Sequence, residues 1–272
     1  MVTVLFWNVG RKPLLARLAR LAAREAADVV ILAECVDAPA DVVTALNTVG
    51  TGWAFPPSAC KRLRTFTRLP TGALTEVFND ASQRLNVWEL RTDAGLPVLL
   101  AGVHLVSKVG WSDADQAAFT QRVAANLEVE EDRQPNRGTV VIGDFNMSPF
   151  DDGMIGGFGF HALMTRELAG RRSQRIVQAE PCRRAFYNPM WQFLTDRGAS
   201  PAGTYYRHAA VPDNHYWYAL DQVLVRPELA GKVIRVAILD HDGVDALTVT
   251  GGGWPDTDSG SDHLPVLVSL DI

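Results

Sequence analysis

Residues 139–146, Thr139-Val140-Val141-Ile142-Gly143-Asp144-Phe145-Asn146, join a short apolar run to two polar side chains. The β-branched run at 139–142 predicts a strand that is covered on both faces. Gly143 lets the chain bend after this strand, and Asp144 and Asn146, at positions i and i+2, can point together. The segment therefore predicts a buried strand that ends in a functional pair of side chains.

The other apolar runs of the chain carry polar residues in comparable places. Strands are predicted at residues 2–9, 28–33, 85–90, 97–105, 218–225, 233–239 and 265–270. Polar side chains lie at the ends of these strands or within them, at Asn8, Glu34, His104, Asp221, Asp262 and His263. Each one alone has an ordinary structural explanation, such as a strand-terminating amide or a structural histidine. Strand ends gather at one edge of a sheet, where ligands tend to bind, so their shared position favours one site.

The order of the elements indicates the fold class. Helical patterns lie at residues 14–22, 39–49 and 113–129, between predicted strands, and Thr92–Gly95 resembles a hairpin turn. Strand-helix-strand units combined with hairpins predict mixed β-sheets with helices outside, in the α/β or α+β class. No linker-like stretch or repeat divides the chain, so we predict one domain over residues 1–272.

The overall charge limits the kind of nucleic-acid surface that the protein can have. A net charge of −5 and a pI near 5.7 do not favour a broad cationic surface, although a local groove can still be basic. Basic residues cluster at Lys61–Arg64, Arg171-Arg172 and Arg183-Arg184. We interpret each cluster, taken singly, as a solvated loop or helix face.

Several features point to a cytoplasmic protein. The N-terminal residues have a buried-strand pattern rather than that of a signal peptide, and no segment is long and apolar enough to span a membrane. Cys35, Cys60 and Cys182 are scattered and lack metal-ligand spacing, as expected of thiols in a reducing compartment. Nothing in the sequence indicates an obligate protein partner.

The acidic residues among these polar positions predict a bound cation. An edge that carries Glu34, Asp144, Asp221 and Asp262 would be strongly repulsive unless a positive group lay among them. A hard divalent cation with oxygen ligands satisfies that requirement.

Taken in order, these segments resemble the motif series of the endonuclease/exonuclease/phosphatase superfamily. The matching segments are Trp7-Asn8, Ala33-Glu34, His104-Leu105, Gly143–Asn146, Leu220–Val223 and Ser261–His263. The resemblance covers nearly the whole chain, and Gly143–Asn146 and Ser261–His263 are its most specific parts. It implies a four-layer sandwich of two packed mixed β-sheets flanked by helices, with phosphoester cleavage assisted by Mg²⁺ or Mn²⁺.

The resemblance also assigns metal ligands and catalytic roles. Glu34 and Asp262, with Asn8 nearby, would hold the cation, which would neutralise phosphate oxygens. His263 would activate water or stabilise the phosphate, and Asp221 would orient its imidazole ring.

The remaining predicted catalytic residues surround the phosphate. Asp144 would position or activate the attacking water, and Asn146 would donate a hydrogen bond to phosphate. His104 would protonate the leaving oxygen or bind phosphate. Which histidine acts as base and which as acid is left open.

Departures from the motifs narrow the substrate class. Asn8–Arg11 and Ala33–Val36 differ from the segments typical of abasic-site endonucleases, and Ala219–Gln222 differs from that of inositol-polyphosphate phosphatases. Aromatic residues are dense over 186–218. Some could stack on bases while Arg171, Arg172 and Arg183 contact phosphates, but we favour packing of these aromatic residues within the protein.

The sequence is compatible with three functions. The first is a nuclease that hydrolyses DNA, or RNA as well. The second is a phosphoesterase for lipid headgroups or small soluble phosphates, and the third is an inactive binding scaffold. A cationic stripe along the site would favour the first function, and a closed pocket or an exposed apolar hairpin the second.

Overall fold

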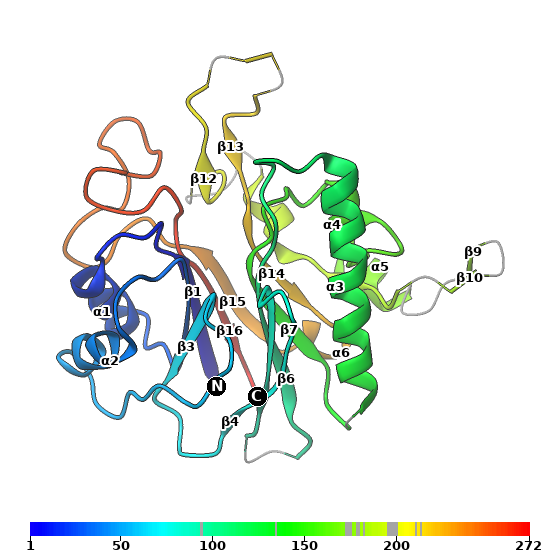
Figure 1. The fold of residues 1–272 in the computed structure, drawn as a ribbon, viewed down its shortest axis with the longest axis horizontal. Coiled ribbons are helices and arrows are strands. Elements are labelled where there is room, and N and C mark those ends of the chain that lie inside the picture. The colour runs from blue at the N-terminus through cyan, green and yellow to red at the C-terminus, as the bar shows by residue number, and fades with distance from the viewer. Residues whose placement is uncertain are drawn as a thin grey trace.

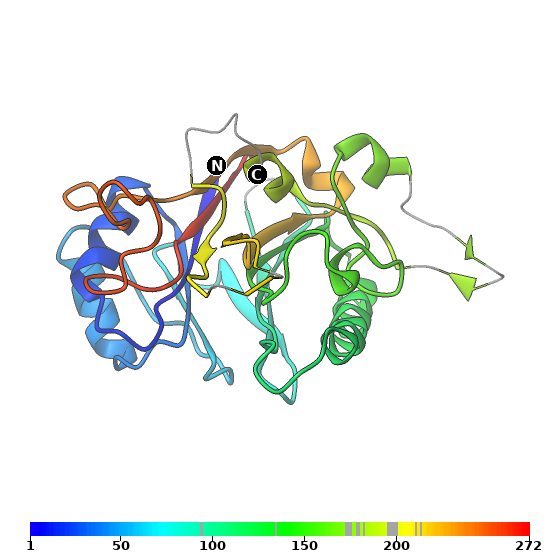
Figure 2. The same ribbon diagram turned by 90° about the horizontal axis from the view of Figure 1, so that it is seen from above.

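The computed structural model describes residues 1–92, 95–133, 135–171, 176–177, 180–181, 183–194, 201–209, 211–212 and 214–272. Two β-sheets pack against each other, and helices lie on their outer faces (Figure 1). Seen from above, helices flank the pair of sheets on both sides (Figure 2). The predicted sandwich of mixed sheets and outer helices is therefore confirmed.

The first sheet has five strands in the order β15-β16-β1-β2-β3. Their bounds are β15 Val233–Ile238, β16 Val266–Leu270, β1 Val2–Asn8, β2 Val29–Ala33 and β3 Leu63–Thr67. β1 runs parallel to β2 and antiparallel to β16. The sequence does not predict β3, because Leu63 and Arg64 belong to the basic cluster that we interpreted as a solvated loop or helix face.

The second sheet has seven strands in the order β4-β5-β6-β7-β14-β11-β8. Their bounds are β4 Leu74–Asn79, β5 Leu85–Leu90, β6 Val98–His104, β7 Thr139–Asp144, β14 Asp221–Val225, β11 Phe186–Tyr187 and β8 Ala162–Leu163. β7 is parallel to β6 and antiparallel to β14. β5 and β6 pair antiparallel, as a hairpin requires, although Asp93 and Ala94 of the predicted turn lie outside the described residues.

Two short strand pairs lie apart from these sheets. They are β9 Ile176–Val177 with β10 Glu180–Pro181, and β12 Tyr205–Tyr206 with β13 Trp217–Tyr218. The strand predicted at 218–225 is therefore two strands, β13 and β14. This division places Asp221 at the first residue of β14, opposite the last residue of β7.

The helices flank the two sheets. Their bounds are α1 Leu15–Arg24, α2 Pro39–Asn47, α3 Asp113–Arg133, α4 Asp152–Ile155, α5 Arg166–Arg171, α6 Pro227–Ala230 and the 3₁₀ helix η1 Pro189–Phe193. α1 and α2 lie beside the first sheet, and α3 lies along the second (Figure 1). α3 continues four residues beyond the predicted Val129, because buried Glu130 and Glu131 are neutralised by Arg133 and Arg226.

Apolar side chains fill both sides of the second sheet. Alternate residues of its strands point to opposite faces, so Leu100 and Ile142 join the core with the first sheet, while Leu99 and Val141 pack with α3. Burial of each such side chain contributes roughly 1.5–3 kcal/mol. This packing brings the ends of β1, β2, β6 and β7 to one edge of the sandwich. One domain over residues 1–272 stays a prediction.

Candidate active site

Three of the predicted site residues lie in one row across the second sheet. His104 and Asp144 end the parallel strands β6 and β7 and are register partners. Asp221 begins β14 and is the register partner of Asp144 from the other side. Because adjacent strands lie about 4.8 Å apart, this pairing alone places the three side chains in a compact row.

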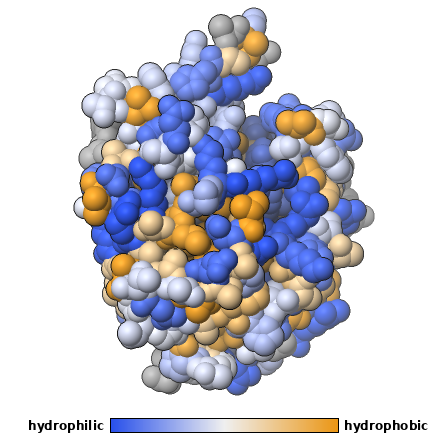
Figure 3. Space-filling model, turned by 60° about the vertical axis from the view of Figure 1, so that its left-hand side comes forward, coloured by the Kyte–Doolittle hydropathy of each residue, from blue (hydrophilic) through white to orange (hydrophobic). Residues whose placement is uncertain are grey.

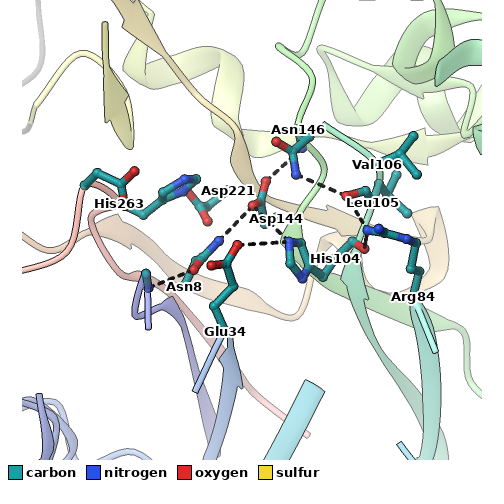
Figure 4. A network of polar contacts seen from close by, with 12 residues as sticks. Asn8, Glu34, Arg84, His104, Leu105, Val106, Asp144, Asn146, Asp221 and His263 are labelled. Carbon is teal, nitrogen blue, oxygen red and sulfur yellow. Dashed lines mark hydrogen bonds and ion pairs between the residues drawn. The ribbon is translucent and has the colours of Figure 1, made fainter. Parts of the chain in front are cut away.

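Asp144 connects this row to the first sheet. Its Oδ2 accepts a hydrogen bond from the Asn8 amide nitrogen at 3.0 Å, and its Oδ1 accepts one from the Asn146 backbone at 2.8 Å (Figure 4). Asn8 ends β1, and its own amide oxygen accepts a bond from the Gly10 backbone. Burial raises the pKa of the Asp144 carboxyl, and the nearby charge of Asp221 raises it further.

Asp221 and His263 form a buried pair. His263 Nδ1 lies 2.8 Å from Asp221 Oδ2, and the His263 carbonyl accepts a hydrogen bond from the Trp7 indole. Burial alone would lower the pKa of His263, but the charges of Asp221 and Asp144 and the hydrogen bond raise it to about 10. The ring is therefore an imidazolium at neutral pH, held in one orientation.

His104 has the opposite protonation behaviour. Its Nε2 lies 3.7 Å from Glu34 Oε1 and 3.8 Å from Asp144 Oδ2. Burial lowers the pKa of His104, and the charge of Asp144 only partly offsets this effect. The site thus combines a cationic and a neutral histidine, an arrangement suited to different roles in one reaction.

The three predicted metal ligands surround the end of β1. Glu34 directly follows Ala33, the register partner of Asn8, and has a left-handed backbone, with φ of 52°. Asp262 lies on the other side of β1, where its Oδ1 would be 3.0 Å from a Cβ added to Gly10. Left-handed residues other than glycine are uncommon and often mark functional positions.

One cavity of about 310 Å³ collects most of these residues. Six of the eight predicted site residues line it, namely Asn8, Glu34, His104, Asp144, Asn146 and His263. Asp221 lies behind His263, fully buried, and Asp262 is not among the lining residues.

Four basic residues also line the cavity, at Arg11, Lys61, Arg62 and Arg84. Lys61 and Arg62 are exposed loop residues, as the interpretation of the Lys61–Arg64 cluster predicts, and they also face the cavity, whereas Leu63 and Arg64 belong to β3. Sequence reasoning missed Arg84 altogether, and the only available signal was its place just before an apolar strand. These side chains make the cavity locally basic in an acidic protein.

The aromatic and arginine residues over 171–218 divide into two groups. Phe186 and Met190 are buried in the core, as expected of packed residues. Tyr206 instead lies near the surface on β12, where it stacks on Trp254 with ring centroids 5.4 Å apart. Arg171 and Arg183 pair with carboxylates of Glu167 and Glu128, which leaves them poorly suited to contact phosphate. Arg172 and Cys182 lie outside the described residues.

The side chains present fit a divalent cation. Asp144, Asp221 and His263 each offer a ligand atom, and these atoms lie within 4.8 Å of one another. Asp221 Oδ1 is buried and has no hydrogen-bond partner among the described residues. Buried carboxylate oxygens are costly without a partner, and oxygen donors are preferred by hard divalent ions. Among the described residues, this buried group could therefore bind a metal.

Comparisons with known proteins establish the family. The model of the endonuclease/exonuclease/phosphatase family matches residues 5–263, and the chain therefore belongs to this family. Enzymes of this family are metal-dependent hydrolases. The resemblance in the sequence motifs is thus confirmed. A search of curated protein sequences finds no match.

Solved structures share this fold at low sequence identity. An AP endonuclease from Archaeoglobus fulgidus aligns over 100% of both chains, with 12% identity and a TM-score of 0.57. The 3′ phosphatase NExo from Neisseria, bound to product DNA hairpin, aligns over 100% of both chains, with 16% identity and a TM-score of 0.55. A truncated TDP2 from Caenorhabditis elegans covers 98% of this chain and 96% of its own, with 15% identity and a TM-score of 0.54. Identities this low show a common fold alone.

Proposed function

We propose that this protein is a metal-dependent phosphodiesterase that hydrolyses nucleic acid, with DNA as the first candidate substrate and RNA as the second. The observation that carries the proposal is the buried Asp221–His263 pair next to Asp144, at a cavity that basic side chains also line. A fixed cation beside a buried carboxylate suits attack on an anionic ester, because one group stabilises negative charge while the other accepts a proton.

The catalytic roles follow from the protonation of each group. His263, kept protonated by Asp221, would donate a hydrogen bond to a phosphate oxygen and stabilise the charge that develops there. Asp221 would hold the ring through Nδ1 and leave Nε2 for the substrate. Asp144 would position the attacking water and accept its proton, and its raised pKa makes it a stronger base than an ordinary aspartate.

His104 and Asn146 would bind the phosphate from the second sheet. The lowered pKa of His104 favours a neutral ring that donates a hydrogen bond to phosphate or to the leaving oxygen. One Asn146 amide N–H bonds to the Leu105 carbonyl, which orients the side chain, and the other would be available to the substrate.

We assign Mg²⁺ or Mn²⁺ to Glu34 and Asp262, with Asn8 nearby. When bound, the ion would neutralise non-bridging phosphate oxygens. His263 and Asp221 are poorer candidates, although they belong to the group that could bind a metal, because they bind each other. A protonated imidazole has no lone pair to give to a metal.

The relatives and the surface charge support nucleic acid as substrate. One structural relative is named as an AP endonuclease, and another is bound to a DNA hairpin. Four basic side chains line the cavity beside only two carboxylates, those of Glu34 and Asp144. Hydrophilic residues also predominate over the upper part of the face in Figure 3, where apolar residues form separate small patches. Contacts with phosphate need a basic surface, which the lining of this cavity provides.

A lipid or small-phosphate substrate is the second candidate. The observation that favours it is the exposure of two apolar side chains between β12 and β13, Val211 and Tyr216. No helix within the described residues could cross a membrane. We retain the cytoplasm as the proposed compartment, since Cys35 and Cys60 are free thiols.

A cleavage panel tests the proposed function. It contains supercoiled plasmid, linear duplex, single-stranded DNA, RNA, phosphoinositides and sphingomyelin, each assayed with Mg²⁺ and Mn²⁺, and includes the His263→Ala variant as the control. We expect metal-dependent cleavage of DNA that is lost in the variant. Cleavage of lipids alone would move the assignment to the second candidate. No cleavage of any substrate, with competent residues at every catalytic position, would favour the inactive scaffold.

A further inference from the structure

Three of the four basic side chains of the cavity come from two loops, and the fourth, Arg11, follows β1 and pairs with Glu34. Lys61 and Arg62 precede β3, and Arg84 precedes β5. In the close view, Arg84 lies on the far side of His104 from His263 (Figure 4). The cavity therefore has a basic side and a catalytic side, with His104 between them.

The positive charge on this side is only partly offset within the described chain, where Asp80 and Asp144 lie near enough to Arg84 to attract its charge. Lys61, Arg62 and Arg84 form no ion pair with the described residues, and Glu34 already pairs with Arg11 at 3.5 Å. Arg62 and Arg84 are close enough for their like charges to interact unfavourably. Cations that face a cavity without a carboxylate partner are suited to bind an anion.

The position of this basic side is fixed by hydrogen bonds within the β4–β5 loop and by one between the two loops. The Asp80 carboxylate accepts bonds from the backbone nitrogens of Arg84 and Leu85, at 2.6 and 2.8 Å. The Gln83 side-chain oxygen accepts one from the Lys61 backbone at 3.0 Å. The two loops therefore form one unit, and the charged side chains project from a defined backbone.

Arg84 is further held by the strand that carries His104. Its terminal nitrogen Nη1 donates to the carbonyls of His104 and Leu105, both at 2.9 Å. The guanidinium is half-buried and stands at the cavity wall. An ordered arginine beside the catalytic histidine can recognise a phosphate at one place relative to the scissile bond.

We propose that Lys61, Arg62 and Arg84 form a subsite for a second phosphate of the substrate, adjacent to the phosphate that is cleaved. This proposal rests on the proposed function, which supplies the scissile phosphate at His263. A nucleotide chain satisfies the subsite, because a further phosphate lies one nucleotide away. A substrate with a cationic headgroup, such as phosphocholine, is disfavoured by the same charges.

Three thymidine dinucleotides test the subsite. TpT, pTpT and TpTp share one phosphodiester and differ only in a terminal phosphate. Their dissociation constants are measured with the Asp144→Asn variant, which would bind without cleavage, and their cleavage is followed with the unmodified protein. We expect at least one phosphorylated dinucleotide to bind about tenfold more tightly than TpT, a difference of about 1.4 kcal/mol, because its terminal phosphate would form charge-assisted hydrogen bonds with the subsite.

Paired charge variants test whether Lys61 and Arg62 cause the preference for the terminal phosphate. Lys61→Gln with Arg62→Gln should abolish the preference for the terminal phosphate. Arg171→Gln with Lys232→Gln removes the same charge elsewhere, at the end of α5 and beside Asp271, where both carboxylate partners are exposed, and should retain the preference. A third variant, Arg84→Lys, keeps the charge but loses the planar guanidinium. It should weaken the preference for the terminal phosphate.

The outcomes separate this proposal from the proposed function. Equal affinity for all three dinucleotides, or a preference that survives Lys61→Gln with Arg62→Gln, would overturn the subsite. Cleavage of TpT without any preference would leave the proposed function in place and remove the subsite. A preference without cleavage would establish the subsite and count against the proposed activity.

Discussion

Asp144 has four other predicted site residues as its immediate neighbours. It accepts hydrogen bonds from Asn8 and Asn146, approaches His104 at 3.8 Å and is the register partner of Asp221. Two buried carboxylates on adjacent strands would repel each other strongly without His263 as their counterion. Apart from Asn146, the groups that set the charge state of this residue therefore lie far away along the chain.

Removal of either proposed catalytic group should abolish turnover and preserve the fold. Asp144→Asn and His263→Ala are each expected to lower kcat by about 10²–10⁴-fold, the usual contribution of general acid–base catalysis. Asp41→Asn, at an exposed position of α2, is the matched control and should keep full activity. Circular dichroism checks folding, and undiminished kcat in either variant would disprove the role given to that residue.

Protonation of His263 should make stability depend on pH. Its pKa is about 10 in the folded protein and about 6.5 in an unfolded chain, so the folded state holds the proton more tightly. Its stabilising contribution is fully present below pH 6.5 and is lost as pH rises towards and through 10. The free energy of unfolding should fall over this window, by at most about 1.4 kcal/mol per pH unit for one proton.

Urea unfolding from pH 6 to 10, in the presence of chelator, measures this effect. His263→Gln removes the titrating ring, so the difference in unfolding free energy between the native sequence and the variant should narrow with rising pH. Parallel profiles for the two proteins would show that the Asp221–His263 pair does not hold the extra proton.

At the scale of elements, the contact between β6 and β7 sets the position of Asp144. Sequence reasoning assigned Gly143 to a bend, but Gly143 is part of β7, and a Cβ there would lie only 2.0 Å from the Val103 carbonyl oxygen. Glycine is needed because the β6 backbone occupies the space of a side chain. The close approach of the two strands places His104 beside Asp144.

Gly143→Ala should therefore destabilise the protein by about 3 kcal/mol, at the upper end of overpacking effects, because backbone rather than a flexible side chain must move. Gly102→Ala is the control on the neighbouring strand, since its added Cβ would meet side-chain atoms at 3.5–3.7 Å, an ordinary contact distance. Denaturant unfolding compares the two variants, and an equal cost for both would contradict the steric explanation.

At the scale of the whole molecule, charge is distributed unevenly. The chain has a net charge of −5, yet its cavity is lined by four basic residues and two carboxylates. Such a distribution attracts a phosphate to one place while the rest of the surface repels it. We propose that Glu34 and Asp262 hold the metal ion and that the basic side of the cavity holds the substrate.

Metal removal should affect both activity and stability. Chelator is expected to abolish hydrolysis, and Mg²⁺ or Mn²⁺ should restore it. Because a ligand that binds only the folded state stabilises it, added metal should also raise Tm. Glu34→Gln should eliminate this rise in Tm, whereas Asp221→Asn should retain it. The reverse pattern would assign the ion to the buried Asp144, Asp221 and His263 group.

Local sequence was enough to predict most strands and the residues that end them. Apolar runs of period two and short polar side chains after them are local properties, so Asn8, Glu34, His104 and Asp144 could be located without a structure. The family was also readable from the order of these segments. β3 and β4 were missed, because each has too few apolar residues to form either a continuous or an alternating apolar pattern.

Only the tertiary structure decided which distant residues share the site. Lys61, Arg62 and Arg84 line the cavity because two loops far from β7 in sequence pack beside it, and no local pattern encodes that proximity. The charge on His263 could not be predicted from the sequence either, because it depends on burial and on Asp221, 42 residues away along the chain. Sequence patterns record what one segment prefers, whereas electrostatic fields and cavities arise from segments brought together by folding.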